Sequence, residues 1–429
     1  MQNVSCPSCG APVQFKSHAS VMAVCEFCRA TVVKEEGAVR DLGKMSAVLE
    51  DYSRIQIGTE GRYGQRNFAV VGRIQLRYAA GMWNEWYLLF DDGTAGWLGD
   101  SSGMYVVTTE HPLGASFPAF EMVRPGRSYE IGAGRFTASE KRVAECIGGQ
   151  GELPFRVGEG WQAKVADFRQ RGAFATLDYS EGDKPVLYVG TAVTLEQMQC
   201  QLLRDDEQIK ASAGKYRGRV DSLSCPSCGT AVNYVPGLAN NLLCQSCHAQ
   251  LDSSKPQVQV LAKGEQMDRV SFTLPLGATG KVSGKEHRVI GAMVRSDEEG
   301  SSWTEYLLYS TTMGFLWLVE TEDGWSRANV MPEWPLPGEP DEAGVVVDTV
   351  RYGRDLRYTA RVDYAAGAFN WRVQVGDTVQ VSEFARGQTR LAAELSEDEL
   401  TWSRSTPVAF DQVATWFGMK ADLPKMALP

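Results

Sequence analysis

Hydrophobic and polar positions alternate over short stretches along most of the chain, and helical periodicity is rare. Turn-forming residues such as those at 91–96 and 125–128 separate these stretches. This pattern predicts strands in a meandering antiparallel sheet rather than βαβ units. We expect a mainly β fold whose bodies are β-sandwiches or partly open barrels. The clearest predicted strands are 68–71, 86–90, 104–107, 173–177 and 306–308.

Only a few short segments have a helical pattern. Residues 194–203 form one, with Thr194 as a candidate N-cap, and residues 407–417 form a second. Residues 39–52 are a weaker third candidate. We therefore expect few short helices in an otherwise β structure.

The chain contains an internal duplication. Its first four paired cysteines recur 219 residues later (225 minus 6), and the same offset relates three glycines. At an offset of 220, a Trp-x-Glu motif and a further tryptophan recur, so one inserted residue explains the slip. The repeated residues are Gly58, Gly61, Gly72, Trp83, Glu85 and Trp97, matched by Gly277, Gly280, Gly291, Trp303, Glu305 and Trp317.

This duplication predicts four segments. They are a zinc ribbon at 1–34, a β-rich body at 35–210, a linker with a second zinc ribbon at 211–252, and a second body at 253–429. The polar run 204–222 is the expected boundary between the halves, exposed and sensitive to proteases. The repeated glycines are expected at turns or bulges that need positive φ or close backbone approach.

Each set of four cysteines has the spacing C-x2-C-x15-C-x2-C, which is typical of a zinc site. Gly10 and Gly229 follow the first pairs and permit tight turns. Because sulfur fills all four positions, no site is left open for water, which favours a structural role over catalysis. We predict two structural Zn²⁺ ions per chain, held by Cys6, Cys9, Cys25 and Cys28 and by Cys225, Cys228, Cys244 and Cys247.

An iron–sulfur cluster is the alternative occupant of these cysteines. His18 and His248 lie close to the two cysteine sets in the sequence. We expect each to be a surface group or a neighbour of the ligands, since four sulfurs already suffice. Cys146 and Cys200 are then expected to be buried free thiols.

Composition narrows the class of protein. The chain has 429 residues, 22% of them charged, and should form more than one domain. No apolar run reaches the ~20 residues of a membrane helix and no secretory signal precedes Cys6, so we expect a cytoplasmic protein. A net charge of -10 repels a phosphate backbone, so we do not expect a nucleic-acid partner.

The repeated glycines, W-x-E-[WY] and the later Trp-Leu pairs Trp97-Leu98 and Trp317-Leu318 resemble the bacterial domain-of-unknown-function family 4178. The resemblance implies β-rich modules preceded by zinc ribbons, with no established activity. It also implies genes beside those of a protein similar to phage shock protein A, a small integral membrane protein and a protein like a polyamine aminopropyltransferase. An envelope-stress or polyamine-linked assembly, peripheral to the inner membrane, follows from that neighbourhood.

Trp83 with Glu85, and Trp303 with Glu305, are two residues apart and so share a face of a strand. Two interpretations stay open. Tryptophan can pack at the edge of the core while glutamate accepts hydrogen bonds or pairs with an arginine. Alternatively, the pair forms an aromatic-floored acidic pocket for a cation such as a polyamine.

Catalytic motifs are absent: the four histidines have no H-E-x-x-H spacing, and no G-x-S-x-G elbow occurs. We therefore expect a non-enzymatic zinc-binding scaffold or interaction protein of a bacterial cytoplasmic complex, with protein partners near the membrane and a link to envelope stress. One alternative is a polyamine- or small-molecule-responsive protein that uses the Trp–Glu face. A nucleic-acid-binding zinc-ribbon protein is the second alternative.

Overall fold

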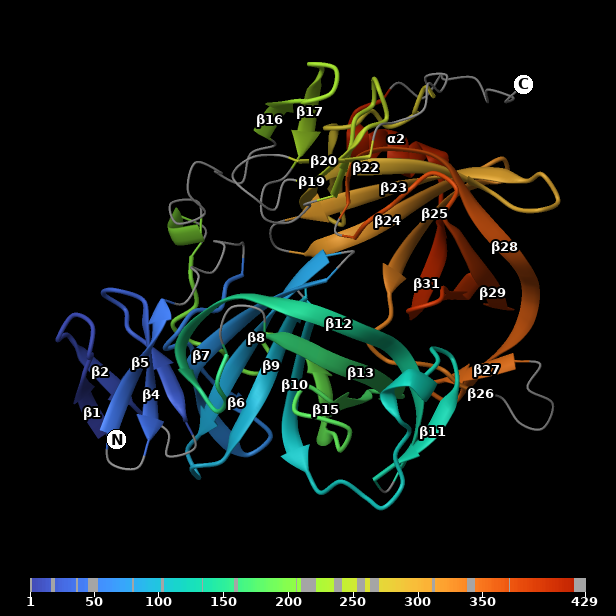
Figure 1. Cartoon of the computed structure of the whole chain (residues 1–429). Helices are drawn as coiled ribbons and strands as arrows, with labels where there is room; N and C mark the ends of the chain where they lie inside the picture. The colour runs from blue at the N-terminus through green and yellow to red at the C-terminus, as the bar shows by residue number, and fades with distance from the viewer. Residues whose placement is uncertain are drawn as a thin grey trace. The chain divides into compact units, whose positions relative to one another are not determined.

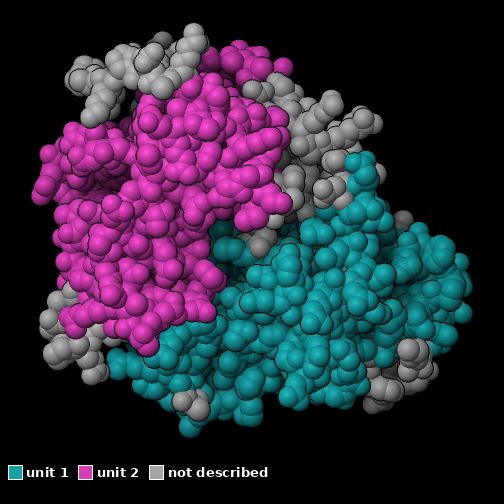
Figure 2. All heavy atoms as spheres, turned by 180° about the vertical axis from the view of Figure 1, so that it is seen from behind, with its two compact units in different colours: residues 1–217 teal, residues 218–429 magenta. Residues whose placement is uncertain are grey.

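The computed structural model is dominated by antiparallel strands (Figure 1), so the mainly β prediction is confirmed. The chain forms two compact units, Met1–Arg217 and Gly218–Pro429 (Figure 2). The structure describes residues 2–16, 20–35, 38–44, 53–78, 81–101, 104–132, 134–157, 161–205, 207–209, 221–234, 241–252, 259–262, 270–310, 313–337, 344–369 and 371–419.

The first unit is built on a closed ring of antiparallel strands. Neighbouring strands in the ring are hydrogen-bonded all the way round, because the last strand, β12, pairs with the first, β7. Of the two expected architectures, the structure therefore has the barrel. In ring order the strands are β7 (Arg66–Tyr78), β8 (Gly81–Phe90), β9 (Ala95–Ser101), β10 (Met104–His111), β15 (Val186–Val193), β14 (Ala173–Asp178), β13 (Gln162–Gln170) and β12 (Gly134–Leu153).

The second unit repeats this ring, which closes through the pairing of β28 with β22. Short strands extend each ring: β6 (Glu60–Tyr63) and β11 (Ser128–Ile131) in the first unit, and β21 (Thr279–Val282), β26 (Leu336–Pro337) and β27 (Gly344–Val347) in the second. The ring strands are β22 (Lys285–Ser296), β23 (Ser302–Ser310), β24 (Gly314–Thr321), β25 (Gly324–Val330), β31 (Leu400–Val408), β30 (Thr389–Leu395), β29 (Thr378–Arg386) and β28 (Val350–Phe369).

The long strands β12 and β28 close the two barrels. Each has 20 residues and curves strongly (Figure 1). β-Bulges bend them, as the pairing register shifts between Ala138 and Glu140 in β12 and between Arg354 and Leu356 in β28. The bend lets one end of the strand pair with its sequence neighbour and the other end pair with the far side of the sheet.

Glycine is required where the barrel closes. A Cβ on Gly72 would lie 1.7 Å from the backbone oxygen of Glu152, and one on Gly291 would lie 2.6 Å from that of Ala368. Both glycines stand at register shifts of the pairing between the first two ring strands. Gly58 has φ 87° and Gly277 has φ 86°. The prediction of bulges, close approach and positive φ at the repeated glycines is confirmed.

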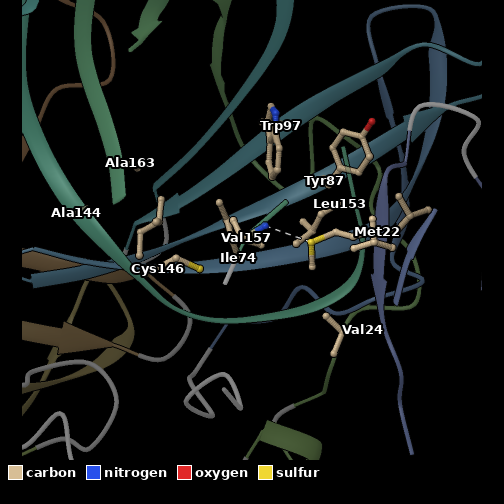
Figure 3. Close-up of a cluster of buried hydrophobic side chains, with 13 residues drawn as sticks. Met22, Val24, Ile74, Tyr87, Trp97, Ala144, Cys146, Leu153, Val157 and Ala163 are labelled. Atoms are coloured by element: carbon tan, nitrogen blue, oxygen red, sulfur yellow. Dashed lines mark hydrogen bonds between the residues drawn. The ribbon is translucent and has the colours of Figure 1, made fainter. Parts of the chain in front are cut away.

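Side chains from opposite sides of the first ring meet inside it. Ile74 of β7, Tyr87 of β8, Trp97 of β9, Ala144 of β12 and Ala163 of β13 belong to one buried cluster (Figure 3). These five strands are consecutive in the ring, and Tyr188 of β15 on the other side packs against the same cluster. The cluster is therefore the barrel interior, and the residues that alternate with it face outward. Segments outside the ring bury the outward faces, among them the 3₁₀ helix η1 (Phe120–Met122) and residues near Leu195 and Met198.

Each cysteine-containing ribbon is hydrogen-bonded to its barrel. Strand β3 pairs with the end of β12 at Leu153, and β18 pairs with the end of β28 at Phe369. The second half of each ribbon therefore continues the sheet of its barrel, whereas the first two strands of each ribbon form a separate two-stranded sheet. The ribbon strands are β1 (Gln2–Ser5), β2 (Pro12–Phe15), β3 (Met22–Val24), β4 (Ala30–Glu35) and β5 (Ala38–Lys44), then β16 (Asp221–Ser224), β17 (Ala231–Tyr234), β18 (Asn241–Leu243), β19 (Gln250–Asp252) and β20 (Gln259–Ala262).

The helix at 407–417 is confirmed as α2 (Phe410–Phe417), which ends at Gly418 with φ 63° and buries Val413 against the outer face of the second barrel. The prediction for 194–203 is wrong after one turn. Thr194 and Gln197 cap that turn reciprocally, at 3.1 and 2.8 Å, but Gln199 then adopts φ 50° and ends it.

The weaker helix prediction at 39–52 is also wrong where the structure describes it. Ala38–Lys44 is strand β5, paired with β4, and residues 45–52 lie outside the described residues. Much of the expected boundary at 204–222 also lies outside them. Arg204 at its start is buried, and its Nη1 donates to the Ser53 backbone oxygen at 3.0 Å.

Candidate metal centres

All four C-x2-C pairs adopt the same turn. In each, the amide of the first cysteine donates to the carbonyl five residues on, and its carbonyl accepts from the amide four residues on, at 2.8–3.1 Å. The fourth residue after the first cysteine has positive φ, as expected for Gly10 and Gly229. Sequence reasoning missed that Arg29 (φ 62°) and His248 (φ 54°) take the same conformation. Their shared position, four residues after Cys25 and Cys244, was the available signal.

The turns bring the predicted ligands together in two groups. Within each group, all four Sγ atoms lie within 4.8 Å of one another. The Cys6–Cys28 and Cys9–Cys25 sulfurs are 3.7 Å apart, and the corresponding pairs of the second group are 3.7 and 3.6 Å apart. A tetrahedron of ~2.3 Å metal–sulfur bonds has edges of about 3.8 Å, whereas a disulfide needs about 2.05 Å. The cysteines are free thiols placed to hold a tetrahedral metal ion.

Backbone and hydroxyl donors stabilise the thiolate form of some ligands. A hydrogen bond from the Ala30 backbone lowers the pKa of Cys28 to about 7. The side chain and then the backbone of Thr230 lower the pKa of Cys228 to about 6. The Ser246 amide donates to the sulfur of Cys244 at 3.4 Å. Because thiolate is the form that binds metal, these donors favour metal binding. Burial raises the pKa of Cys225 and Cys244, and the neighbouring Cys28 thiol raises that of Cys9, so a bound cation is needed to hold these three as thiolates.

We call the two sets of four cysteines, Cys6–Cys28 and Cys225–Cys247, the first and second metal groups. Buried contacts connect the ribbon of the first metal group to its barrel. The Lys16 amide donates to the buried Glu152 carboxylate at 2.7 Å, and the Val21 amide donates to the Leu153 oxygen at 2.9 Å. The Val157 amide contacts the sulfur of Met22 at 3.3 Å (Figure 3). The folding of the ribbon and the closure of the barrel are therefore linked through the last residues of β12.

The two histidines near the cysteines have different outcomes. His248 is only 5% exposed and its ring lies edge-on to Tyr364, with centroids 5.1 Å apart. It is thus a buried neighbour of the second metal group rather than a surface residue. His18 lies outside the described residues. Of the two other cysteines, Cys146 is buried and Cys200 is partly buried, and both are free.

The Trp–Glu pair has the same geometry in both units. Trp83 Nε1 donates to Glu85 Oε1 at 2.8 Å, and Trp303 Nε1 donates to Glu305 Oε1 at 2.7 Å. Trp83 and Tyr87 both pack in the barrel interior, and Glu85, which lies between them at a spacing of two residues, is on the same face of β8. Both tryptophans are partly buried, as in the structural interpretation.

An arginine of the same unit lies near each tryptophan ring. The guanidinium carbon of Arg142 lies 5.8 Å from the Trp83 ring centroid, and that of Arg295 lies 5.8 Å from the Trp303 ring centroid. A tyrosine edge contacts each ring as well, from Tyr78 at 5.6 Å in the first unit and from Tyr358 at 5.7 Å in the second. The face of the indole in both units is thus in contact with the protein itself.

The two glutamates differ in their charged partners. Arg295 Nη1 lies 3.0 Å from Glu305 and 3.3 Å from Glu394. Glu85 has no ion pair within the described residues, and burial raises its pKa to about 7, with nearby Asp178 and Asp100 adding to the rise. The paired-arginine interpretation therefore holds in the second unit and fails in the first.

Sequence reasoning missed two further interior carboxylates of each barrel. In the strand register, Asp178 lies opposite Val165, and Glu394 lies opposite Val381 at the equivalent position. Likewise, Asp167 lies opposite Thr176, and Glu383 lies opposite Ala392. These acids are therefore equivalent in the two units. Their offset is 216 (394 minus 178) rather than 219 or 220, so the search at the earlier offsets did not find them.

The family model "Domain of unknown function (DUF4178)" matches residues 56–195 and 275–410, which are the two barrels with their outer segments. No curated protein and no solved structure matches the chain. Among the described residues, the structure contains no helix with the length and apolar character to cross a membrane. The two cysteine groups precede the two matched regions.

Proposed function

Because this chain belongs to the DUF4178 family, a domain of unknown function, we propose that it is a non-enzymatic scaffold whose two metal-stabilised barrels present surfaces to protein partners. The observation that carries the proposal is the four-sulfur geometry of each cysteine group. Four thiolates complete a tetrahedron, so the metal has a structural role and no open position for substrate. The hydrogen bonds between ribbon and barrel support the same conclusion.

The metal we propose is Zn²⁺, two ions per chain. An all-thiolate tetrahedral donor set suits zinc, which binds cysteine at about 2.3 Å. Elemental analysis of protein purified without chelator should give close to two zinc ions per chain in a colourless solution. Visible absorption with iron and sulfide in the preparation would instead establish iron–sulfur clusters. A metal content near zero would overturn the metal proposal altogether.

The partners we propose are proteins of a bacterial cytoplasmic complex at the periphery of the inner membrane, with a role in envelope stress. The resemblance described above supports this location, and the net charge of -10 disfavours nucleic acid as the partner. The test is affinity purification of the tagged protein from its own bacterium, after mild cross-linking and detergent solubilisation. Stoichiometric recovery of a membrane-associated protein is the expected result.

A matched pair of variants sharpens that experiment. Cys25→Ser removes a ligand of the first metal group, whereas Cys200→Ser changes a free thiol outside both groups. Loss of the partner in Cys25→Ser but not in Cys200→Ser would assign the contact to the metal-bound form of the first unit. Recovery of the wild-type protein alone would refute the scaffold proposal, and a gel shift at low salt would then test the nucleic-acid alternative.

A second candidate function is the response to a small organic cation such as a polyamine. One observation favours it, namely that Glu85 lacks the arginine that neutralises Glu305. Calorimetric titration with spermidine tests it, and binding that disappears in Glu85→Gln is the expected result. The absence of heat at millimolar spermidine would refute it.

A further inference from the structure

The two barrels can be compared residue by residue, because their strands pair in matching register. Leu76 lies opposite Trp83 in the first unit, where Arg295 lies opposite Trp303 in the second. Across the barrel, Asp178 occupies the position of Glu394. The second barrel thus shows how the shared acids and tryptophan are arranged around an arginine at this position.

In the second barrel a guanidinium is bound between two carboxylates. Arg295 Nη1 lies 3.0 Å from Glu305 Oε1 and 3.3 Å from Glu394, and its side chain is only 5% exposed. The guanidinium also lies near the Trp303 ring. We call this position, between the two acids and beside the tryptophan, the cation seat. The Glu394 side chain is 38% exposed, so this carboxylate forms the solvent side of the seat.

The first barrel keeps the acids and the tryptophan of the cation seat but replaces its arginine with Leu76. Glu85 retains the hydrogen bond from Trp83. Arg142 lies as close to the Trp83 ring as Arg295 lies to the Trp303 ring, 5.8 Å in both units, but its ion pair is with Glu140. Within the described residues it forms no ion pair with Glu85 or Asp178, so it does not replace Arg295 between the two acids. Asp178 accepts hydrogen bonds from the Ser180 amide and hydroxyl, which are uncharged partners. The seat in the first unit therefore has two carboxylates without the cation that balances them in the second.

We propose that the cation seat of the first unit, formed by Glu85 and Asp178 beside Trp83, binds the guanidinium or primary ammonium group of a small organic cation. The ligand takes the place that Arg295 fills in the second unit. A planar guanidinium can donate to both carboxylates at once, and an ammonium can do so as a point charge. Glu85 is the more deeply buried of the two acids, and Asp178 retains more exposure, so the ligand would enter from the side of Asp178. This inference rests on the second candidate function, for which it specifies the site and the cationic group, and it is independent of the scaffold role.

The test is isothermal titration of the full-length, metal-loaded protein with methylguanidinium chloride, which carries the head group of arginine. Sodium chloride at equal ionic strength serves as the reference titration. We expect one binding event in the wild type and none in Leu76→Arg, which supplies the cation from within. Arg295→Leu opens the seat of the second unit and should bind two molecules. Methylammonium chloride in a parallel titration distinguishes a guanidinium seat from an ammonium seat.

A near-isosteric variant keeps the proposal testable if Leu76→Arg fails to fold. Glu85→Gln preserves the acceptor for Trp83 but removes the charge, and should weaken binding by about tenfold or more. Binding unchanged in Glu85→Gln would identify an adventitious site and overturn the proposal. Absence of binding to the wild type would overturn it too, and would mean that a proton, not an organic cation, neutralises Glu85.

Discussion

At the scale of single residues, the metal groups depend on cysteines whose identity cannot be exchanged. Cys25 is 1% exposed and its sulfur lies 3.7 Å from that of Cys9. Serine has a similar shape but a hydroxyl that does not ionise near neutral pH, so it cannot replace a thiolate ligand. Since a ribbon of about 30 residues buries too little apolar surface to fold alone, the loss of one ligand removes much of its folding free energy.

Cys25→Ser should therefore reduce the metal content from two ions per chain to one and destabilise the first unit by several kcal/mol. Elemental analysis and thermal unfolding measure the two effects. Cys200→Ser is the matched control, because Cys200 is a free thiol outside both metal groups, and it should retain two ions. Full metal content in Cys25→Ser would show that the four-sulfur group is not the metal site.

Glu85 makes the stability of the first unit depend on pH. Its folded-state pKa is raised to about 7 from 4.5, so the folded state binds more protons than the unfolded state between these values. Stability therefore falls as the pH rises through this window. In buffer free of organic cations, Glu85→Gln should be more stable than the wild type by about 2–3 kcal/mol at pH 8 and equal to it near pH 4.

Urea unfolding at several pH values measures this difference. Glu140 also has a pKa raised to about 7, by burial, so the variant should keep part of the slope. Glu305→Gln is the comparison in the second unit. Burial raises the pKa of Glu305 as well, but Arg295 opposes that rise, so this substitution should stabilise the protein less than Glu85→Gln at pH 8. Equal effects of the two substitutions would contradict the assigned difference between the units.

At the scale of strands, the barrel closes where glycine lets two strands approach. The bulge beside Gly72 brings β7 against the end of β12. A Cβ added to Gly72 would lie 1.7 Å from the Glu152 oxygen, so there is no room for a side chain. The same strand end carries the ribbon, through the pairing of Leu153 with Met22. One backbone crossing therefore determines both the closure of the barrel and the attachment of the metal group.

Gly72→Ala should destabilise the first unit by at least about 3 kcal/mol, because the backbone itself must move to accept a methyl group. Chemical denaturation measures the loss. Gly353→Ala in β28 is the control, since no atom lies within 4 Å of its added Cβ, and it should change stability by less than about 0.5 kcal/mol. Similar stabilities of the two variants would mean that the close approach at Gly72 is not maintained in solution.

At the scale of the whole molecule, each metal group supports one barrel. The amide of Val21 bonds to Leu153, so the ribbon and β12 share hydrogen bonds. The remaining ring strands, such as β13 and β14, are held by pairing and by apolar clusters away from the ribbon. Metal loss should consequently destabilise the end of β12, and of β28 in the second unit, before the other strands of each barrel.

Hydrogen exchange with and without a chelator tests this order of stability. Removal of metal should abolish protection at β3 and at the last residues of β12, while amides of β13 and β14 stay protected. In Cys25→Ser the change should be confined to the first unit, with β18 and β28 exchanging as in the wild type. Simultaneous loss of protection throughout a barrel would show that ribbon and barrel unfold as one unit.

The sequence by itself determined the features that depend on local chemistry and exact repetition. Four cysteines at C-x2-C spacing define a metal group wherever the ribbon lies, because each pair forms its own turn. Alternating apolar positions predict strands, and the duplicated glycines mark positions where backbone geometry excludes a side chain. The mainly β class, the two tandem units and α2 followed from these signals.

Tertiary structure alone decided how distant strands meet. The closure of β12 on β7 depends on hydrogen bonds between segments about 70 residues apart, which no local pattern encodes. The turn at 194–203 began with the expected cap but ended after one turn, because strand pairing of Gln201 with Glu60 outweighs helix propensity. The difference between Glu85 and Glu305 likewise depends on strand pairing, which places Leu76 beside one Trp–Glu pair and Arg295 beside the other, since burial and charge partners are properties of the folded chain.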